Sequence, residues 1–259
     1  MASLPIAVPS ARDDDPHNDP EQAVEWDHER TIRAALIRWQ CIDHTAKCLV
    51  DPRGVQIHAA RIEDVLDLSF ATVSFPLQFT ACLFASRVEL FGAQLEALYL
   101  QHSRSAAFSA DGLKVRGNLS FRYGDATGEV RLGRAEIGGH LMCNNATFKN
   151  PGGVSLFADG IKVAGSVFLN SFNAEGELRL VAAHVGGNLE CDSAKFRNEG
   201  KVALNADGIK VKHNVFLRAD FRVGGDVRLV GAEILGQLNC SDCRFAIDSW
   251  MNAEPGLGQ

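Results

Sequence analysis

The segment GEVRLGRAEIGGHLMCNNATF at residues 128–148 recurs as GELRLVAAHVGGNLECDSAKF at 176–196 and as GDVRLVGAEILGQLNCSDCRF at 225–245. Apolar residues in each copy stand two apart, as Val130 and Leu132 do, and not at the helical period of about 3.6 residues. A fixed period of about 20 to 50 residues is typical of a repeat array. The segment therefore predicts a coil of short strands in which each copy supplies one turn.

Weaker copies fill the gaps between these three. The strand openings recur at intervals of 24 residues, with one interval of 25, at Arg104, Gly128, Gly152, Gly176, Gly200 and Gly225. Alternate copies are the most alike, because ADGLKV at 110–115 returns as ADGIKV at 158–163 and 206–211. The repeating unit is thus two turns, and each turn is expected to have four sides. Earlier strands at Val55 and Val88, with irregular spacing, bring the total to about eight turns.

The chain divides into four parts. They are an acidic, Pro-rich tail at 1–24 that is expected to be disordered, a helical cap at 25–48, a β-helix at 53–245 and a C-terminal tail at 246–259. In the cap, Ile32, Ala35, Leu36 and Trp39 fall on one helical face. That face is expected to cover the first turn, whose strand edges and apolar side chains need protection.

Composition excludes several classes of protein. A net charge of −6 gives no reason to expect nucleic-acid binding, and no apolar run approaches the length of a membrane span. The N-terminus lacks the basic and apolar regions of a secretory signal. Seven cysteines without such a signal suggest free thiols in a reducing compartment, so a cytoplasmic location is expected.

Stacked turns convert sequence positions into columns. Three inward columns are predicted: Leu119, Leu141, Val167, Leu189, Val215 and Leu238; then Phe121, Cys143, Leu169, Cys191, Leu217 and Cys240; then Phe148, Phe172, Phe196, Phe221 and Phe245. Cysteines two turns apart are separated by roughly 9 to 10 Å, too far for a disulfide or one zinc ion. Cys243, which completes a C-x-x-C pair, stands where other copies have Ala146 or Ala194. The cysteines are therefore interpreted as core residues, and neither metal nor cofactor is predicted.

Two polar columns are expected to face outward. One alternates in sign, except that His184 stands between two lysines, and reads Lys114, Glu136, Lys162, His184, Lys210 and Glu233. It is interpreted as a surface ion-pair ladder. The other reads Asn118, His140, Ser166, Asn188, Asn214 and Gln237. Side chains of this second kind bond along a stack of strands, and a polar groove for a ligand is the alternative.

A third outward column is unexpectedly apolar. It reads Tyr99, Ser120, Met142, Phe168, Glu190, Phe216 and Asn239. Exposed apolar stripes mark covered or binding surfaces. Tyr99, Met142, Phe168 and Phe216 are therefore the predicted binding residues. The candidate occupants are a second subunit or partner, the N-terminal segment, or a small molecule.

The irregular turns between Arg53 and Arg104 supply the weak catalytic candidates, because sites tend to lie where a regular array is broken. These candidates are His58, Asp64, Asp67, Tyr99 and His102, with Gln101 nearby. No nucleotide-binding, metal-binding or nucleophile motif accompanies them.

The three quoted segments, with A-x-[IF] pairs such as Ala146 and Phe148, resemble pentapeptide-repeat proteins. They are similar in particular to a bacterial group often labelled membrane-associated oxidoreductases. The resemblance implies a right-handed quadrilateral β-helix and supplies no catalytic residue. Some family members bind DNA gyrase as acidic duplex mimics and dimerise through their C-termini. That mimicry needs continuous acidic columns, whereas the columns here alternate in sign or are neutral.

The sequence thus predicts a non-catalytic interaction or scaffold module. Its partner is a protein or a second copy, bound at an end of the β-helix or along the Phe168 and Phe216 stripe. The alternative is an enzyme or accessory protein of a biosynthetic pathway, with a pocket between the early turns and the N-terminal helix. A gyrase-binding duplex mimic is a lesser alternative.

Overall fold

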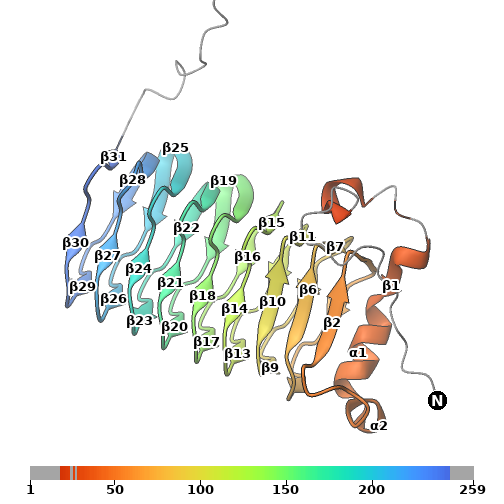
Figure 1. Cartoon of the computed structure of the whole chain (residues 1–259). Coiled ribbons are helices and arrows are strands. Elements are labelled where there is room, and N and C mark those ends of the chain that lie inside the picture. The colour runs from red at the N-terminus through yellow and green to blue at the C-terminus, as the bar shows by residue number, and fades with distance from the viewer. Residues whose placement is uncertain (1–17, 24–25, 27, 246–259) are drawn as a thin grey trace, which may run out of the picture.

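The chain forms a right-handed, four-sided β-solenoid, as the repeat predicts. The structure is a computed structural model that describes residues 18–23, 26 and 28–245. Figure 1 shows the turns stacked side by side, with the helices at the N-terminal end of the column. The predicted tail at 246–259, and most of the one at 1–24, lie outside the described residues. We number the faces of the column 1 to 4 in chain order.

Face 1 holds one strand from each turn, and its nine strands give nine turns rather than the expected eight. They are β2 (Val55–His58), β6 (Leu77–Thr80), β10 (Leu98–Gln101), β14 (Leu119–Ser120), β18 (Leu141–Met142), β21 (Val167–Phe168), β24 (Leu189–Glu190), β27 (Val215–Phe216) and β30 (Leu238–Asn239). All neighbouring pairs are parallel.

Faces 2 and 3 belong to one sheet. Face 2 contains β1 (Thr31–Arg33), β3 (Arg61–Glu63), β7 (Leu83–Phe84), β11 (Arg104–Ser105), β15 (Asp125–Ala126) and, in the last turn, β31 (Arg244–Phe245). Face 3 contains β4 (Leu66–Asp67), β8 (Val88–Glu89), β12 (Phe108–Ser109) and β16 (Val130–Arg131). In later turns a single strand runs round the corner between these faces, as β19 (Thr147–Phe157), β22 (Asn173–Arg179), β25 (Lys195–Asn205) and β28 (Arg222–Arg228).

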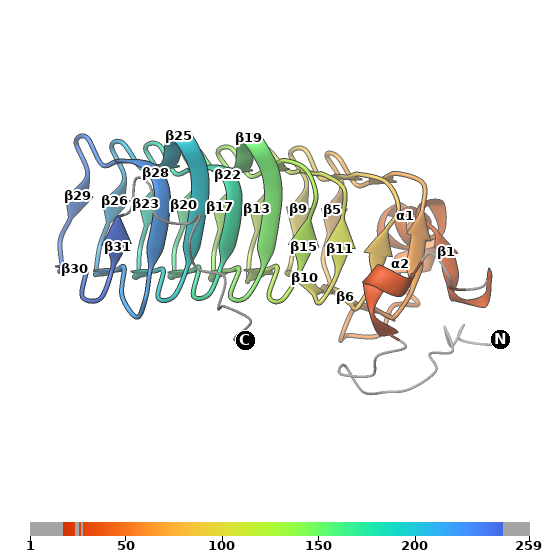
Figure 2. The same ribbon diagram turned by 90° about the horizontal axis from the view of Figure 1, so that it is seen from above.

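Face 4 is a separate sheet of eight strands, seen in a row in Figure 2. They are β5 (Thr72–Val73), β9 (Gln94–Leu95), β13 (Lys114–Val115), β17 (Glu136–Ile137), β20 (Lys162–Val163), β23 (His184–Val185), β26 (Lys210–Val211) and β29 (Glu233–Ile234). Their register places the charge column in one line, as predicted.

Turn length alternates along the later part of the column. On face 1, Leu141 pairs with Val167 of the next turn and Val167 pairs with Leu189, so a longer turn precedes a shorter one. The early turns are short as well, because Leu77 pairs with Leu98. The regular interval between strand openings in the sequence is therefore the mean of a long turn and a short turn.

The prediction that the early turns between Arg53 and Arg104 are irregular is wrong, because these turns are evenly spaced and compact. It arose from treating Val55 and Val88 as equivalent strands. Val55 lies on face 1, whereas Val88 lies on face 3. The extra residues instead lengthen β19 and β25, whose pairing with neighbouring strands contains register shifts.

The N-terminal cap is shorter than expected and buries another face. Besides the short 3-10 helices Pro20–Gln22 and His28–Arg30, it contains α1 (Ala34–Ile42) and α2 (His44–Lys47). The buried side chains of α1 are Ala34, Ile37 and Cys41, whereas Leu36 and Trp39 are exposed. Because the residues just before α1 form β1 and pair with β3, that strand sets the rotation of the helix.

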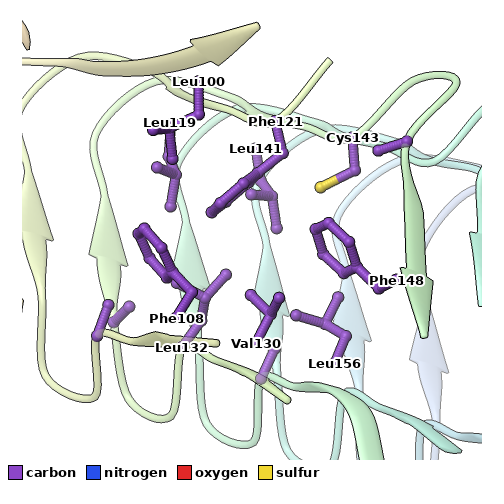
Figure 3. Packing of buried hydrophobic residues seen from close by; sticks show 14 of the residues in the cluster. Leu100, Phe108, Leu119, Phe121, Val130, Leu132, Leu141, Cys143, Phe148 and Leu156 are labelled. Atoms are coloured by element: carbon purple, nitrogen blue, oxygen red, sulfur yellow. The ribbon is translucent and has the colours of Figure 1, made fainter. Parts of the chain in front are cut away.

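Inward side chains fill the column (Figure 3). The first two predicted columns are correct, and both are buried up to the last turn. The phenylalanine column needs a correction, because Phe148 pairs with Ala174 and Ala174 with Phe196. Phe172 lies one column away, at the corner, and its ring still meets that of Phe148 edge to face at 5.0 Å. Large and small residues thus alternate in two adjacent columns.

The polar column on face 1 has a structural role. Each side chain from Asn118 to Asn214 accepts a hydrogen bond from the backbone N–H of the next member, over 2.8–3.1 Å. Ser166 Oγ, for example, accepts from the N–H of Asn188 at 3.0 Å. A Cβ added at Gly187 would lie 2.3 Å from Ser166 Oγ, so the glycine admits this side chain. The hydrogen bonding favours the stacking interpretation of this column over a ligand groove.

The aspartates of the three ADG segments join consecutive turns. Asp159 Oδ2 accepts from Arg179 Nη2 at 2.6 Å, and its Oδ1 accepts from the N–H of Val181 at 3.2 Å. Asp111 and Asp207 make the same bonds one repeat away. Charge-assisted bonds of this kind contribute more than neutral ones.

Asp159→Ala is expected to lower the free energy of unfolding by about 1–3 kcal/mol, because the N–H of Val181 loses its acceptor and half-buried Arg179 keeps only Glu177 as a partner. Urea unfolding followed by circular dichroism measures the loss. Asp226→Ala is the matched control, since Asp226 is exposed and makes no ion pair with a described residue, and it is expected to shift stability by less than about 0.5 kcal/mol. Equal effects of the two variants would contradict the assignment.

Cysteine reactivity is expected to follow burial. Loss of hydration on burial raises the pKa of Cys41 and of Cys82 to about 12, and it raises the pKa of Cys143 and Cys191 further. Only the thiolate reacts, so these four thiols stay protonated and inert at pH 8. Cys48 is exposed and is expected to react first. Peptide mapping after maleimide labelling tests this, and rapid labelling of Cys143 in the folded protein would refute it.

Candidate functional site

Face 4 carries a long groove on its outer surface. Its volume is about 960 Å³, and it runs from Thr72 and Ser74 in the first turn to Glu233 and Leu235 in the eighth, which carries the last strand of face 4. Eight strands cross it, which at about 4.8 Å per strand gives a length of about 34 Å. Val115 and the residues stacked on it turn inward beneath the groove. The floor of the groove therefore consists of backbone atoms and apolar side-chain atoms.

Two outward columns form the walls of the groove. The first wall is Thr72, Gln94, Lys114, Glu136, Lys162, His184, Lys210 and Glu233. The second wall is Ser74, Glu96, Arg116, Gly138, Ala164, Gly186, Lys212 and Leu235. In the middle of the second wall, three consecutive positions carry nothing larger than a methyl group. The groove is therefore open on that side, opposite Glu136, Lys162 and His184.

Most charges in the groove are paired along the column axis. Glu136 lies 3.4 Å from Lys114 and 3.3 Å from Lys162, and hydrogen bonds from these ammonium groups lower the pKa of its carboxyl. Lys210 pairs with Glu233 at 2.9 Å. The predicted ion-pair ladder is thus present on both sides of His184.

His184 interrupts this ladder. Its Nδ1 lies 3.1 Å from the carbonyl oxygen of Ala182, and its Cα neighbours on either side are Lys162 and Lys210. Lys212 lies on the second wall, exposed and without an ion pair to any described residue. This stretch of the groove therefore has three cations and one histidine, and no carboxylate of the lining stands between them.

The predicted apolar stripe lies on face 1 and is only half exposed. Met142 pairs with Phe168 in the expected register, and Tyr99 lies in the same column. The guanidinium of Arg218 stands 4.0 Å from the centre of the Phe216 ring, and the His140 ring is 5.4 Å from that of Phe168. The protein's own side chains thus cover part of the stripe, and its role in binding stays a prediction.

The weak catalytic candidates are not gathered into one site. His58, Tyr99 and Gln101 lie on face 1, and His102 stacks on Tyr123 at the following corner, with ring centres 4.6 Å apart.

Asp67 lies on face 3, across the core from face 1, and Asp64 lies at the corner before it. The N–H of Ser69 donates to the Asp67 carboxylate and lowers its pKa. None of these six residues, the five catalytic candidates and Gln101, lines the groove on face 4.

Across the residues that the structure describes, no three His, Cys, Asp or Glu side chains are grouped so as to hold a metal ion.

The N-terminal segment, where described, does not cover the stripe. Asn18 Nδ2 lies 3.4 Å from His58 Nε2, and Glu21 pairs with Arg104 at 3.2 Å. These contacts hold it against the ends of face 1 and face 2 strands in the early turns.

The C-terminal end of the described column is its most exposed part. Val230, Leu235, Leu238 and Phe245 are all exposed, although Leu238 continues a column whose earlier members are buried. Strands β29, β30 and β31 also end their sheets. Among described residues, this end lacks the covering that α1 gives the other end.

The chain matches no protein-family model, no curated protein and no solved structure. Within the described residues, no helix has the length and apolar content needed to cross a bilayer.

Sequence reasoning missed the groove. It found the first wall as a charge column but did not weigh the small residues two positions after Glu136, Lys162 and His184. Gly138, Ala164 and Gly186 were the available signal, since outward positions without side chains lower one wall.

Proposed function

We propose that this chain is a non-catalytic interaction module, a rod whose face 4 binds a partner along its length. The observation that carries the proposal is the groove of about 960 Å³, which crosses eight strands and is open where the second wall is reduced to small residues. A stack of turns makes an extended surface of this kind available to an elongated ligand.

The distribution of reactive groups favours binding over catalysis. The carboxylates in the groove are engaged in ion pairs, Glu136 with two lysines, Glu233 with Lys210 and Glu96 with Arg116. The earlier catalytic candidates lie on other faces and apart from one another. A base, a nucleophile and an oxyanion donor do not converge among these residues as catalysis would require.

We propose that the chain is related to the pentapeptide-repeat-like β-helices, a proposal supported by the four-sided outline and the A-x-F pairs. The duplex-mimic alternative receives less support, because the groove is lined by five Lys or Arg residues and three Glu residues. An acidic mimic needs the opposite balance.

Photo-crosslinking is expected to map the partner to face 4. A photoreactive amino acid at Gln94 or Ala164 should give adducts in cells of the source organism, because both positions line the groove. The same residue at Lys149 or Lys195, exposed positions on face 2, serves as the matched control and should give few adducts. Ala164→Trp should lower the Gln94 adduct at least fivefold by filling the groove. Equal adducts from both faces, or none from face 4, would overturn the proposal.

Self-association is a second candidate function, favoured by the exposed apolar turn at the C-terminal end of the column. A second copy presents the same outline and the same open strand edges, so the two ends are self-complementary in shape and in unpaired backbone groups.

Sedimentation velocity distinguishes the two surfaces proposed for self-association. Val230→Ser with Leu238→Ser is expected to convert an oligomer to monomer by removing apolar area from the end of the column. Phe168→Ser with Phe216→Ser is the comparison, since that stripe is partly covered by Arg218 and His140. A monomeric wild-type protein would rule out self-association, and dissociation by the stripe variant alone would place it on face 1.

A further inference from the structure

The alternation of positive and negative side chains in the charge column of face 4 is interrupted at one position. Lys114, Lys162 and Lys210 occupy alternate turns, and Glu136 and Glu233 lie in two of the turns between or beyond them. Continued alternation would place a carboxylate at 184, and the chain has a histidine. That histidine is exposed and contacts only the carbonyl oxygen of its own corner among the interactions described. The departure therefore does not serve packing.

The result is a cationic stretch beside the open part of the groove. Lys162 and Lys210 stand two turns apart on the first wall, about 9.6 Å at 4.8 Å per strand. Lys212 faces them from the second wall, next to Gly186. Each paired ammonium uses one of its three N–H donors on a glutamate, so donors remain for a ligand.

We propose that this stretch binds a single, extended acidic segment of a polypeptide, with its carboxylates over Lys162, Lys210 and Lys212. The inference rests on the proposed function and names the chemistry of the partner. Charge complementarity is the first argument, because three cations without an intervening carboxylate attract an anionic ligand.

The dimensions of the groove favour one extended chain. A volume of about 960 Å³ spread over about 34 Å leaves a cross-section of about 28 Å². An α-helix with its side chains is about 10–12 Å wide, and a nucleic-acid duplex is wider still. A single extended chain is narrower than either and matches the groove better.

The chemistry of the lining favours a polypeptide over a single-stranded nucleic acid. Among the residues that the structure describes, no Phe, Tyr or Trp lines the groove, whereas proteins that bind single strands rely on aromatic rings for base stacking. A polyproline II segment rises about 3.1 Å per residue, so every third residue recurs after about 9.3 Å. That interval is close to the two-turn separation of Lys162 and Lys210, so an acidic residue at every third position meets both lysines.

Fluorescence anisotropy with the purified full chain tests the inference. The probe is a labelled (Glu-Pro-Pro)5 peptide, and the uncharged (Gln-Pro-Pro)5 peptide is its control. The acidic peptide is expected to bind at least tenfold more tightly, and its affinity should fall as salt rises. Lys210→Gln with Lys212→Gln should lower its affinity at least tenfold. Lys149→Gln with Lys195→Gln, which removes the same charge from face 2, should change it less than twofold.

Position 184 gives the sharper readout, because both variants keep an exposed polar side chain. His184→Glu completes the alternation and is expected to lower affinity for the acidic peptide at least tenfold. His184→Lys should preserve or raise it. Unchanged circular dichroism and melting temperature establish that each variant is folded.

Three results would overturn the inference. One is equal affinity of wild type and His184→Glu. Another is tighter binding of an oligogalacturonate or a single-stranded oligonucleotide than of the acidic peptide, which would assign the groove to a glycan or a nucleic acid. The third is no binding of any anionic probe. If the face 4 crosslinks persist in that case, the interaction module stands and only its ligand chemistry is wrong.

Discussion

Every turn of this protein must return to the same four-sided outline one strand spacing further on. Parallel pairing on all faces depends on it, since the N–H of Glu136 reaches the carbonyl of Leu113 at 2.8 Å and the N–H of Lys162 reaches that of Ala135 at the same distance. The chain meets this constraint with inward residues that stack in continuous columns from turn to turn. Extra length is admitted only where a strand bends outward, in β19 and β25.

Because long and short turns alternate, charged side chains on the outer surface recur every second turn. An ADG aspartate recurs in every second turn and binds an arginine of the turn that follows, as Asp159 binds Arg179. The lysines of face 4 follow the same rhythm, because Lys162 and Lys210 come three residues after these aspartates. Spacing of charge on the surface is therefore a consequence of how the backbone closes its turns.

Columns were predictable from sequence wherever consecutive turns keep the same number of residues between two faces. That condition holds from face 4 to face 1, so the charge column, the polar column and the leucine column were found correctly. It also holds between faces 1 and 2 in the two turns that carry Phe148 and Phe172, since Thr147 and Asn173 each come six residues after the paired Leu141 and Val167. The two rings were wrongly placed together because they were assumed to occupy one position of the turn, whereas Phe148 comes seven residues after Leu141 and Phe172 five residues after Val167. The sequence carried the signal, since A-x-F at 146–148 alternates with F-x-A at 172–174.

The N-terminal helix and the groove depended on information that periodicity lacks. Several apolar faces were available between residues 32 and 41, and the pairing of β1 with β3 selected Ala34 and Ile37. The groove exists because one outward column loses its side chains at Gly138, Ala164 and Gly186. Missing side chains do not produce a periodic pattern in the sequence. The low part of the second wall is therefore recognised only by comparison with the first wall, which keeps its side chains.

The fold constrains Val185 but places no constraint on the side chain of its outward neighbour, His184. The fold requires a β-strand with Val185 turned inward, and it leaves the outward neighbour free. An exposed ion pair contributes less than about 1 kcal/mol, so replacing a carboxylate by histidine costs the solenoid little. The same replacement changes the local field of the groove far more, because two lysines then flank a residue without negative charge. The change at position 184 thus has little effect on the free energy of folding and a large effect on the electrostatic potential of the groove. A rigid array can accommodate changes of this kind on a binding surface.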